Sequence, residues 1–245
     1  MSWAAHDFET YVIQKHLGIR VSYLAIFFGT YVPDAFTKWY VYGFTRGPFN
    51  LRADHPAQFH RSWPGAGFTH SIFFIGCVAF TVWLVTHRRS WAKPWALGIL
   101  AGGLAHITTD TADSLGTMLL WPFWTGNVSI GMWAYAAEAG RYDDAGAYYS
   151  SLGVVMDFAW LVIVLVHFQV FRERYFRSVI VTADPWVWGQ LGRVFPQPVL
   201  LALYRASMFY GVTRLLFWTA WAHIANDYQW DLSWGGPDWI TPVHL

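Results

Sequence analysis

The chain has 245 residues, of which 55% are hydrophobic and 13% are charged, and its formal net charge is +1. Soluble domains carry roughly 25% charged residues, so this composition excludes an ordinary soluble protein and indicates an integral membrane protein. The balanced charge leaves no basic surface for nucleic acid, and a single cysteine, Cys77, excludes an internal disulfide. The chain has 17 tryptophans, and such an excess is typical of membrane proteins whose aromatic rings lie at lipid headgroup level.

The N-terminal region predicts two consecutive helical segments. Trp3–His16 has a helical pattern, and Gly18–Val32 is a short apolar span that ends at Pro33. The two segments either pair as a hairpin or tilt together as one long helix, and the pattern leaves both arrangements open.

Four later segments reach the ~20 residues that cross ~30 Å of hydrocarbon. They are Gly67–Thr86, Trp95–Trp121, Leu152–Phe171 and Pro198–Ile224. With the N-terminal span they predict an all-α polytopic membrane bundle of about five transmembrane helices. We expect a single integral membrane domain over residues 1–245, ending in an irregular interfacial tail from Tyr228.

Basic residues predict the orientation of the spans. Two connecting loops are rich in arginine and lysine, and the positive-inside rule places both in the cytoplasm; their basic residues are Arg88, Arg89, Lys93, Arg172, Arg174 and Arg177. The loops at the opposite ends of the spans then face outward. The loop from Asp34 to Ala66 weakens this assignment, because it contains four basic residues.

The segment 104–122 contains ionisable side chains within an apolar span. His106, Asp110 and Asp113 are spaced four and three residues apart, so on a helix they project from one face. Ionisable groups at membrane depth are costly and usually mark a site. Such a face suits a divalent cation, and a buried His–Asp pair that joins two helices is the structural alternative.

Other polar residues are expected at a similar depth on the outer side. Asp34 follows Pro33 at the end of the first span, His70 begins the next span, and His60 lies in the loop before it. Imidazole nitrogens and carboxylate oxygens together suit zinc first, with manganese or iron as alternatives.

Three motifs carry a family resemblance: Pro33-Asp34, the Gly-Phe-Thr-His-Ser segment at 67–71, and His106 and Asp110 followed by Gly116 and Leu-Leu-Trp-Pro at 119–122. They resemble the bacterial inner-membrane metal-dependent hydrolase family, which includes a LexA-regulated membrane-bound hydrolase. That family is distantly similar to zinc-dependent phospholipase C. The resemblance implies a bacterial inner-membrane, multi-pass location and a hydrolase-like core in residues 1–122, with additional helices in 123–245.

The resemblance implies that Asp34, His70, His106 and Asp110 are metal ligands. It adds two more histidines, His6 as the early histidine of the family and His60 as part of its His-Arg pair. The sequence departs from the family in two places. Phe36 replaces the second acid after Pro-Asp, and His60-Arg61 fits only if residues 62–66 are an insertion. These losses imply one metal in place of two, or none.

Arg214 is a further charge inside a predicted span, at about the depth of Asp157. A membrane arginine needs a partner. One interpretation is a structural Arg214–Asp157 pair, and the other is binding of an anionic substrate such as a lipid phosphate.

The functional hypothesis is a membrane-embedded hydrolase that uses its metal on a lipid-linked ester or phosphoester at the outer face, with Asp113 or Asp34 as general base. The alternative is a non-catalytic accessory subunit of a membrane protein complex on the same scaffold. Expected partners are membrane lipids and membrane proteins, and no nucleic acid. An ion transporter is disfavoured, because the acidic groups gather at one side.

Overall fold

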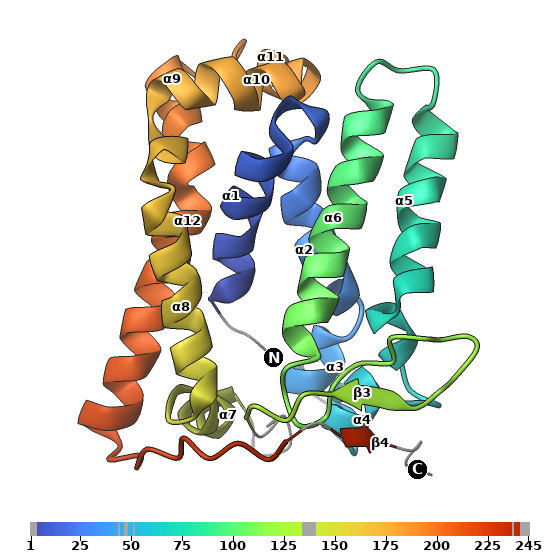
Figure 1. Cartoon of the computed structure of the whole chain (residues 1–245), viewed down its shortest axis with the longest axis vertical. Coiled ribbons are helices and arrows are strands. Elements are labelled where there is room, and N and C mark those ends of the chain that lie inside the picture. The colour runs from blue at the N-terminus through green and yellow to red at the C-terminus, as the bar shows by residue number, and fades with distance from the viewer. Residues whose placement is uncertain are drawn as a thin grey trace.

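The computed structural model describes residues 4–43, 45–46, 49–50, 52–133, 141–236 and 238–240. The structure is mostly helical, and its longer helices run roughly along one axis (Figure 1). These helices are α1 (Ala5–Leu17), α2 (Tyr23–Ala35), α5 (Ile72–Thr86), α6 (Ala92–Asp110), α8 (Leu152–Val166) and α12 (Gln197–Ala220).

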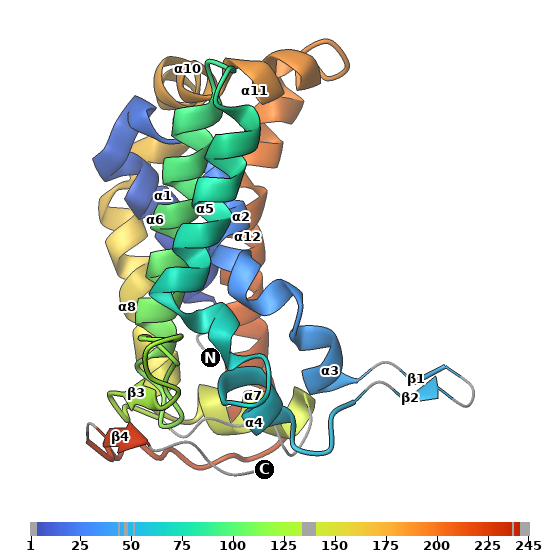
Figure 2. The ribbon, with the colours of Figure 1, turned by 90° about the vertical axis from the view of Figure 1, so that its right-hand side faces the viewer.

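Short elements lie at the two ends of the bundle. The upper end in Figure 1 carries α9 (Glu173–Tyr175), α10 (Val181–Ala183) and α11 (Pro185–Leu191). The lower end carries α3 (Lys38–Tyr42), α4 (Pro56–Arg61), α7 (Arg141–Tyr149), β3 (Asn127–Ser129) and β4 (Asp238–Ile240). The antiparallel pair β1 (Thr45–Arg46) and β2 (Phe49–Asn50) extends sideways from the bundle (Figure 2).

The two N-terminal helices form a hairpin. Gly18 follows α1 with φ +58°, a conformation that glycine adopts without strain, and a 3₁₀ turn over Gly18–Arg20 leads into α2. Of the two arrangements that the sequence left open, the hairpin is the one observed.

A buried carboxylate caps the start of α1. Asp157 of α8 accepts hydrogen bonds from the backbone N–H groups of Ala4 (2.9 Å) and Ala5 (2.8 Å). A negative charge at a helix N-terminus pairs with otherwise unpaired N–H groups and with the helix dipole. Asp157 therefore anchors α1 against α8 and positions the residues of its first turn.

Aromatic side chains of α1, α2 and α12 pack together in the core. Phe8, Tyr11 and Tyr204 are fully buried in this cluster, and the Tyr11 hydroxyl donates a hydrogen bond of 2.6 Å to the Tyr204 carbonyl. The polar tip of a buried tyrosine needs such a partner, so this bond fixes the depth of α1 against α12.

Helices α2 and α6 approach each other closely along small residues. A Cβ atom on Gly102 would lie 2.1 Å from the carbonyl oxygen of Ile26, and one on Gly29 would lie 2.4 Å from that of Ile99. Gly98 and Gly102 form a Gly-x-x-x-Gly pair, the pattern that lets membrane helices approach at backbone distance.

One helical stretch among the described residues is both long enough and apolar enough to cross a membrane. This stretch, Gln197–Ala225, has 29 residues and a mean hydropathy of 1.2, whereas the apolar helices Ile72–Thr86 and Leu152–Val166 have 15 residues each. The helical fold class is observed, and five full spans remain a prediction.

The predicted span Trp95–Trp121 is wrong in its second half, because α6 ends at Asp110. The Asp113 carboxylate accepts hydrogen bonds from the N–H groups of Leu115 and Gly116, and Gly116 has φ +65°. This turn, typical of Asp followed by Gly, diverts the chain. Asp113 therefore does not share a helix face with His106 and Asp110.

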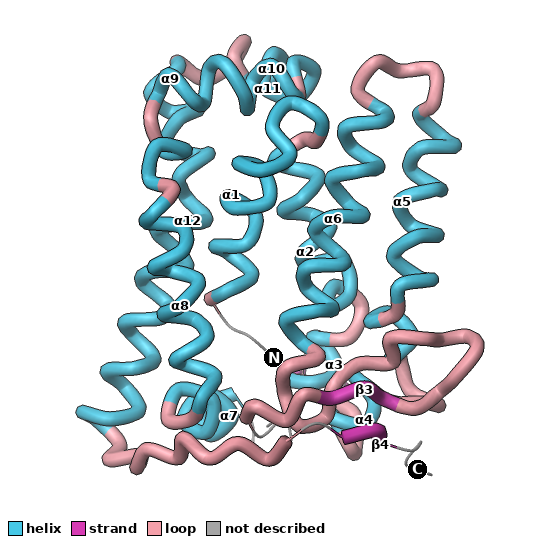
Figure 3. The backbone as a smooth tube through the Cα atoms, viewed as in Figure 1, coloured by secondary structure: helices cyan, strands magenta, loops and turns pink. Residues whose placement is uncertain are grey.

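The chain after α6 and the C-terminal segment form an irregular layer at the lower end (Figure 3). The two segments are joined where β3 pairs antiparallel with β4. The predicted tail is irregular through residue 236, β4 follows, and residues 241–245 lie outside the described residues. The loop between α5 and α6 and the chain after α8 lie together at the opposite, upper end.

Candidate metal centre

Four buried side chains converge where α2 and α6 end and α5 begins. Asp34 lies in the last turn of α2, His70 ends the 3₁₀ helix Gly67–His70, and His106 and Asp110 occupy the last turns of α6. One potential ligand atom from each of the four lies within 4.8 Å of the other three. The sequence predicted this convergence from separate segments.

The separations fit a single cation. Donors bound at ~2.0–2.2 Å in tetrahedral geometry lie about 3.3–3.6 Å apart. His106 Nε2 is 3.0 Å from Asp110 Oδ2 and 3.8 Å from Asp34 Oδ1. His70 Nε2 is 3.5 Å from Asp34 Oδ1 and 3.7 Å from Asp110 Oδ2. The observed distances bracket those of a four-coordinate site.

Three of these atoms, His70 Nε2, His106 Nε2 and Asp34 Oδ1, are buried, and their close polar neighbours in the described part of the chain do not form hydrogen bonds of normal geometry with them. Buried polar atoms nearly always have a partner. The other ring nitrogen of His70, Nδ1, lies 3.0 Å from the Thr69 hydroxyl, which orients Nε2 toward the cluster. A ligating histidine typically has such a second contact, so the donor set fits a divalent cation.

His6 and Glu9 form an outer layer on α1. The His6 ring stacks on His106 with centroids 4.1 Å apart, and His6 Nε2 lies 3.4 Å from Asp110 Oδ1. Its Nδ1 lies 3.5 Å from the buried Glu9 carboxylate, which accepts a hydrogen bond from Thr109. The hairpin thus brings the early histidine beside the cluster, but His6 is not among the four residues whose potential ligand atoms converge, so its role as a metal ligand stays a prediction.

His60 approaches from α4, below the bundle. Its Nε2 is 3.1 Å from Asp34 Oδ1, and its ring centroid is 4.8 Å from that of His70. Burial, reinforced by the positive charge of Lys38, lowers the pKa of His60 to about 3. The imidazole is therefore neutral, the form that binds a cation.

Two basic residues at the cluster were not anticipated as site residues. Arg61 is fully buried, forms an ion pair with Asp110, lies 3.5 Å from Asp113 Oδ2, and donates a 3.0 Å hydrogen bond to the Gly116 carbonyl. Lys38 Nζ lies 3.1 Å from Asp34 Oδ2. Lys38 was counted only as a charge of the outer loop, whereas Arg61 was also considered as the arginine of the family's His-Arg pair, which was the clue to its place at the cluster.

Arg214 is held by α1, and the predicted pair with Asp157 is wrong. Its Nη2 lies 3.0 Å from Asp7 Oδ2, while Asp157 caps α1. Asp7 also accepts a 2.5 Å hydrogen bond from the Tyr31 hydroxyl. The sequence could not reveal this pair, since it depends on how the hairpin sits against α12.

Comparison with known proteins identifies the family. The sequence model of the YdjM inner membrane protein family matches residues 9–175, more than half of the chain. The chain belongs to the YdjM inner membrane protein family. No curated protein and no solved structure matches it.

The YdjM match supports the predicted location in a bacterial inner membrane. The matched region includes Asp34, His60, His70, His106 and Asp110, whereas His6 and Arg214 lie outside it. Membership in the YdjM family does not by itself assign a reaction or a metal.

Proposed function

We propose that this protein is a multi-pass, metal-dependent hydrolase of the inner membrane, acting on a lipid-linked ester or phosphoester. The observation that carries this proposal is the buried set of Asp34, His70, His106 and Asp110, whose separations suit one cation. Two imidazoles and two carboxylates form a mixed nitrogen and oxygen set, which favours zinc, with manganese or iron as alternatives.

A divalent cation at such a site supplies Lewis-acid polarisation of a phosphoryl or acyl oxygen and activates water at neutral pH. Neighbouring residues of the protein hold the side chains of the cluster in position. Thr69 orients His70, Glu9 orients His6, and His60 lies against Asp34. Each contact restricts a ring or carboxylate that would otherwise rotate.

Asp34 and Asp113 are the two carboxylates proposed for the general-base role. Asp34 Oδ1 borders both His70 and His106, while its Oδ2 lies beside Lys38. Asp113 uses Oδ1 to accept two backbone hydrogen bonds, and its Oδ2 lies 3.5 Å from Arg61. Asp34 is the better placed of the two, because Asp113 approaches the cluster only through Arg61.

A lipid-linked substrate follows from the proposed depth of the cluster. The four residues lie at the ends of α2 and α6 and just before the start of α5, remote from the basic loop of residues 87–93. If those basic residues face the cytoplasm, the cluster lies near the headgroups of the outer leaflet. Scissile bonds of lipid-linked esters and phosphoesters are found at this level.

One observation favours the alternative of a non-catalytic accessory subunit. Arg61 is already paired with Asp110, and Lys38 with Asp34. Two cations beside two carboxylates can neutralise the cluster without a metal, and a buried ionic network can then serve to hold the ends of the helices together. Exposed aromatic side chains would in that case contact partner proteins.

Metal analysis separates the two functions. We expect purified wild-type protein to contain one zinc or similar ion per chain, and His106→Ala and Asp110→Ala to lose it while still eluting as folded protein in detergent. Thr108→Ala, on the exposed side of α6, is the matched control and should keep the ion. The hydrolase would be ruled out if the wild-type protein contained no metal and both variants assembled normally.

Released headgroup from reconstituted phospholipid is the second measurement. Hydrolysis that depends on the added ion and disappears in His106→Ala supports the proposal. If the protein binds the ion stoichiometrically but releases no product from ester or phosphoester lipids, the metal site is supported and the hydrolase activity is contradicted.

A further inference from the structure

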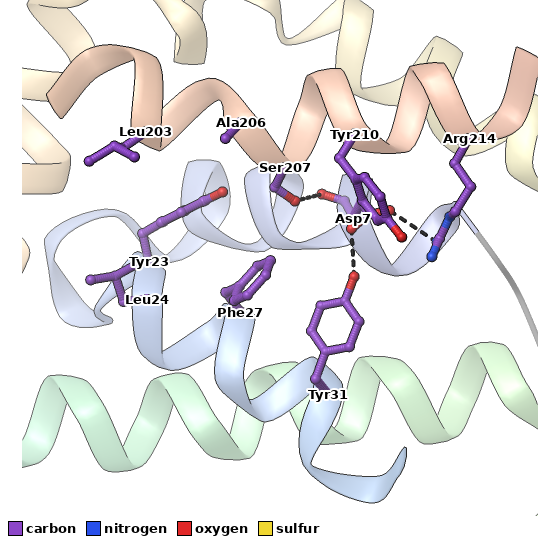
Figure 4. Close-up of a pocket in the computed structure, with 10 residues that line it drawn as sticks. All are labelled: Asp7, Tyr23, Leu24, Phe27, Tyr31, Leu203, Ala206, Ser207, Tyr210 and Arg214. Carbon is purple, nitrogen blue, oxygen red and sulfur yellow. Dashed lines mark hydrogen bonds and ion pairs between the residues drawn. The ribbon is translucent and has the colours of Figure 1, made fainter. Parts of the chain in front are cut away.

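A groove separate from the metal cluster runs between α2 and α12, with α1 as its floor (Figure 4). Its volume is about 510 Å³, within the range of small-molecule sites. The walls are largely apolar, with Leu24 and Phe27 on one side and Leu203 and Ala206 on the other. Leu203 is 48% exposed, so the groove opens toward the surrounding membrane.

The groove has the length of one leaflet. It follows a single face of α12 from Leu203 to Arg214, which are 11 residues apart and therefore separated by about 16 Å along the helix. Half of the ~30 Å hydrocarbon core is ~15 Å. A hydrocarbon chain lying parallel to the helices would fill the groove from end to end.

One end of the groove is polar. Asp7, Tyr31 and Arg214 meet there through the ion pair and hydrogen bond described above (Figure 4), and the Arg214 guanidinium lies 5.0 Å from the Tyr210 ring. Arg214 Nε is buried without a hydrogen-bond partner in the described part of the chain. A donor left unpaired at membrane depth is costly.

The charge at this end selects the chemistry of the ligand. Asp7 neutralises Arg214, so the pair offers no net positive charge to an anion. What is missing is an acceptor for the Nε–H group, and an uncharged carbonyl oxygen supplies one. This modifies the expectation that Arg214 binds a lipid phosphate.

We propose that the groove between α2 and α12 binds one acyl chain of an ester-linked membrane lipid, with the ester carbonyl accepting a hydrogen bond from Arg214 Nε. The chain then lies along Phe27 and Ala206 and points away from the cluster. The occupant is a lipid of the surrounding bilayer.

The groove also fits the proposed reaction, on which this part of the inference rests. Tyr31 precedes Asp34 by three residues, about one helical turn, and Asp7 directly follows His6. A lipid whose carbonyl is at Arg214 would present the next bonds of its headgroup on the side of the Asp/His cluster. The groove would therefore select substrates with a long apolar chain.

The test uses the full-length protein in nanodiscs of phosphatidylglycerol that contain a phosphatidylglycerol probe with a diazirine in its acyl chain. Crosslinked peptides are located by mass spectrometry after illumination. We expect crosslinks to concentrate on Leu24, Phe27, Leu203 and Ala206. Ala206→Trp should lower this labelling by about tenfold, the factor expected when roughly two methylenes lose their burial.

Leu216→Trp is the matched control, since Leu216 is 54% exposed and does not line the groove. This variant should leave the labelling of the groove unchanged. Crosslinks that spread evenly over exposed helix faces and ignore Ala206→Trp would overturn the proposal, since they would describe only lipids of the general annulus.

The carbonyl contact has its own test. An ether-linked probe of equal chain length lacks the acceptor, so the wild type should label about fivefold less with it, the factor of one hydrogen bond. Arg214→Lys retains a cation for Asp7 but has no Nε–H donor, and we expect it to abolish the preference. Equal labelling by both probes in the wild type contradicts the assigned carbonyl contact.

Chelation separates this inference from the proposed function. Groove labelling of wild-type protein should persist after treatment with EDTA, because chain binding needs no metal. If labelling persists in a protein shown to contain no metal, the hydrolase proposal is contradicted and lipid binding in the groove is supported. If the protein contains a stoichiometric metal but shows no selective labelling, lipid binding in the groove is contradicted and the metal site is supported.

Discussion

Asp110 is the residue on which the interpretation of the cluster depends. Its Oδ2 is approached by His106 at 3.0 Å and by Arg61, and its Oδ1 by His6 at 3.4 Å. Carboxylate oxygens can accept hydrogen bonds from N–H donors or coordinate a metal cation. The two functions therefore differ in what lies between Asp110 and the imidazoles, a proton or a metal ion.

Removal of the Thr69 hydroxyl tests whether His70 is a metal ligand. In Thr69→Val the His70 Nδ1 loses its 3.0 Å partner, so the ring is no longer held with Nε2 toward the cluster. We expect metal affinity to fall by about 10–100-fold, measured by competition with a chromogenic chelator. Thr108→Val removes an exposed hydroxyl of α6 and should leave the affinity unchanged. Equal affinities in both variants would remove His70 from the ligand set.

Replacement of Arg61 distinguishes an ionic network from a metal site. Arg61→Met leaves the buried Asp110 without its guanidinium, and loss of one partner of a buried pair costs about 3–5 kcal/mol. Thermal unfolding in detergent with a chelator present should therefore show a lower midpoint for Arg61→Met than for the wild type. Added zinc should raise the midpoint of the variant more than that of the wild type, because the cation takes over the neutralisation of the carboxylates. If zinc moves neither midpoint, the accessory-subunit function is favoured.

Prediction of the site from sequence succeeded where the signal was local. The spacing of His106 and Asp110 and the position of Asp34 after Pro33 are visible in the chain itself, and these residues do meet. The ion pairs of Arg61 and Lys38 could not be predicted in this way, because the sequence of a loop does not show whether its arginine and lysine side chains are buried. Their role depends on α4 folding beneath the bundle.

At the scale of elements, the contact between α2 and α6 aligns the cluster. Gly98, Gly102, His106 and Asp110 are spaced four residues apart, so the small residues and the polar residues lie on one stripe of α6. The stripe that permits close packing against α2 therefore continues into the stripe that faces Asp34. Close helix packing is a condition for the short distances at the site.

Gly102→Ala and Gly76→Ala form a matched pair that tests this condition. A Cβ on Gly102 would lie 2.1 Å from a backbone oxygen of α2, whereas one on Gly76 meets nothing within 4 Å. Alanine favours helix over glycine by about 1 kcal/mol at both positions, but at Gly102 we expect overpacking of about 1–3 kcal/mol to dominate. Thermal midpoints should fall for Gly102→Ala and remain equal or rise for Gly76→Ala.

Loss of bound metal should accompany the lower stability of Gly102→Ala, because separation of α2 from α6 moves Asp34 away from His106. A Gly102→Ala protein that is as stable as wild type and retains its metal would mean that the close approach of the two helices is not needed for the site.

The boundary of α6 shows why apolar patterns overestimate helix length. The run through Leu119, Leu120 and Trp121 remains apolar well after the helix has ended at Asp110. Hydropathy indicates only whether a segment can be buried in an apolar environment. The chain is diverted after α6 by the Asp113 carboxylate, which accepts hydrogen bonds from the N–H groups of Leu115 and Gly116. Asp-Ser-Leu-Gly was the local signal for this turn.

At the scale of the whole molecule, the described structure has two chemically different ends. The upper end holds both basic segments, and Asp184 joins its elements by accepting hydrogen bonds from Ser22 (2.7 Å) and Trp95 (2.9 Å). The lower end holds the Asp/His cluster and the irregular layer of chain. The positions of arginine and lysine in the sequence predict this separation. The number of spans stays a prediction, because among the described residues only Gln197–Ala225 is both long and apolar enough to cross a membrane.

The two ends should face opposite sides of the inner membrane, and cysteine labelling tests this directly. In a Cys77→Ser background, which removes the natural exposed thiol, Ser90→Cys marks the α5–α6 loop and Ser233→Cys marks the C-terminal segment. Both serines are exposed. By the positive-inside rule, a membrane-impermeant maleimide should label Ser233→Cys in intact spheroplasts and Ser90→Cys only after lysis. Labelling of Ser90→Cys alone would place the cluster near the cytoplasmic leaflet, and labelling of both without lysis would contradict a protein that crosses the bilayer between these two positions.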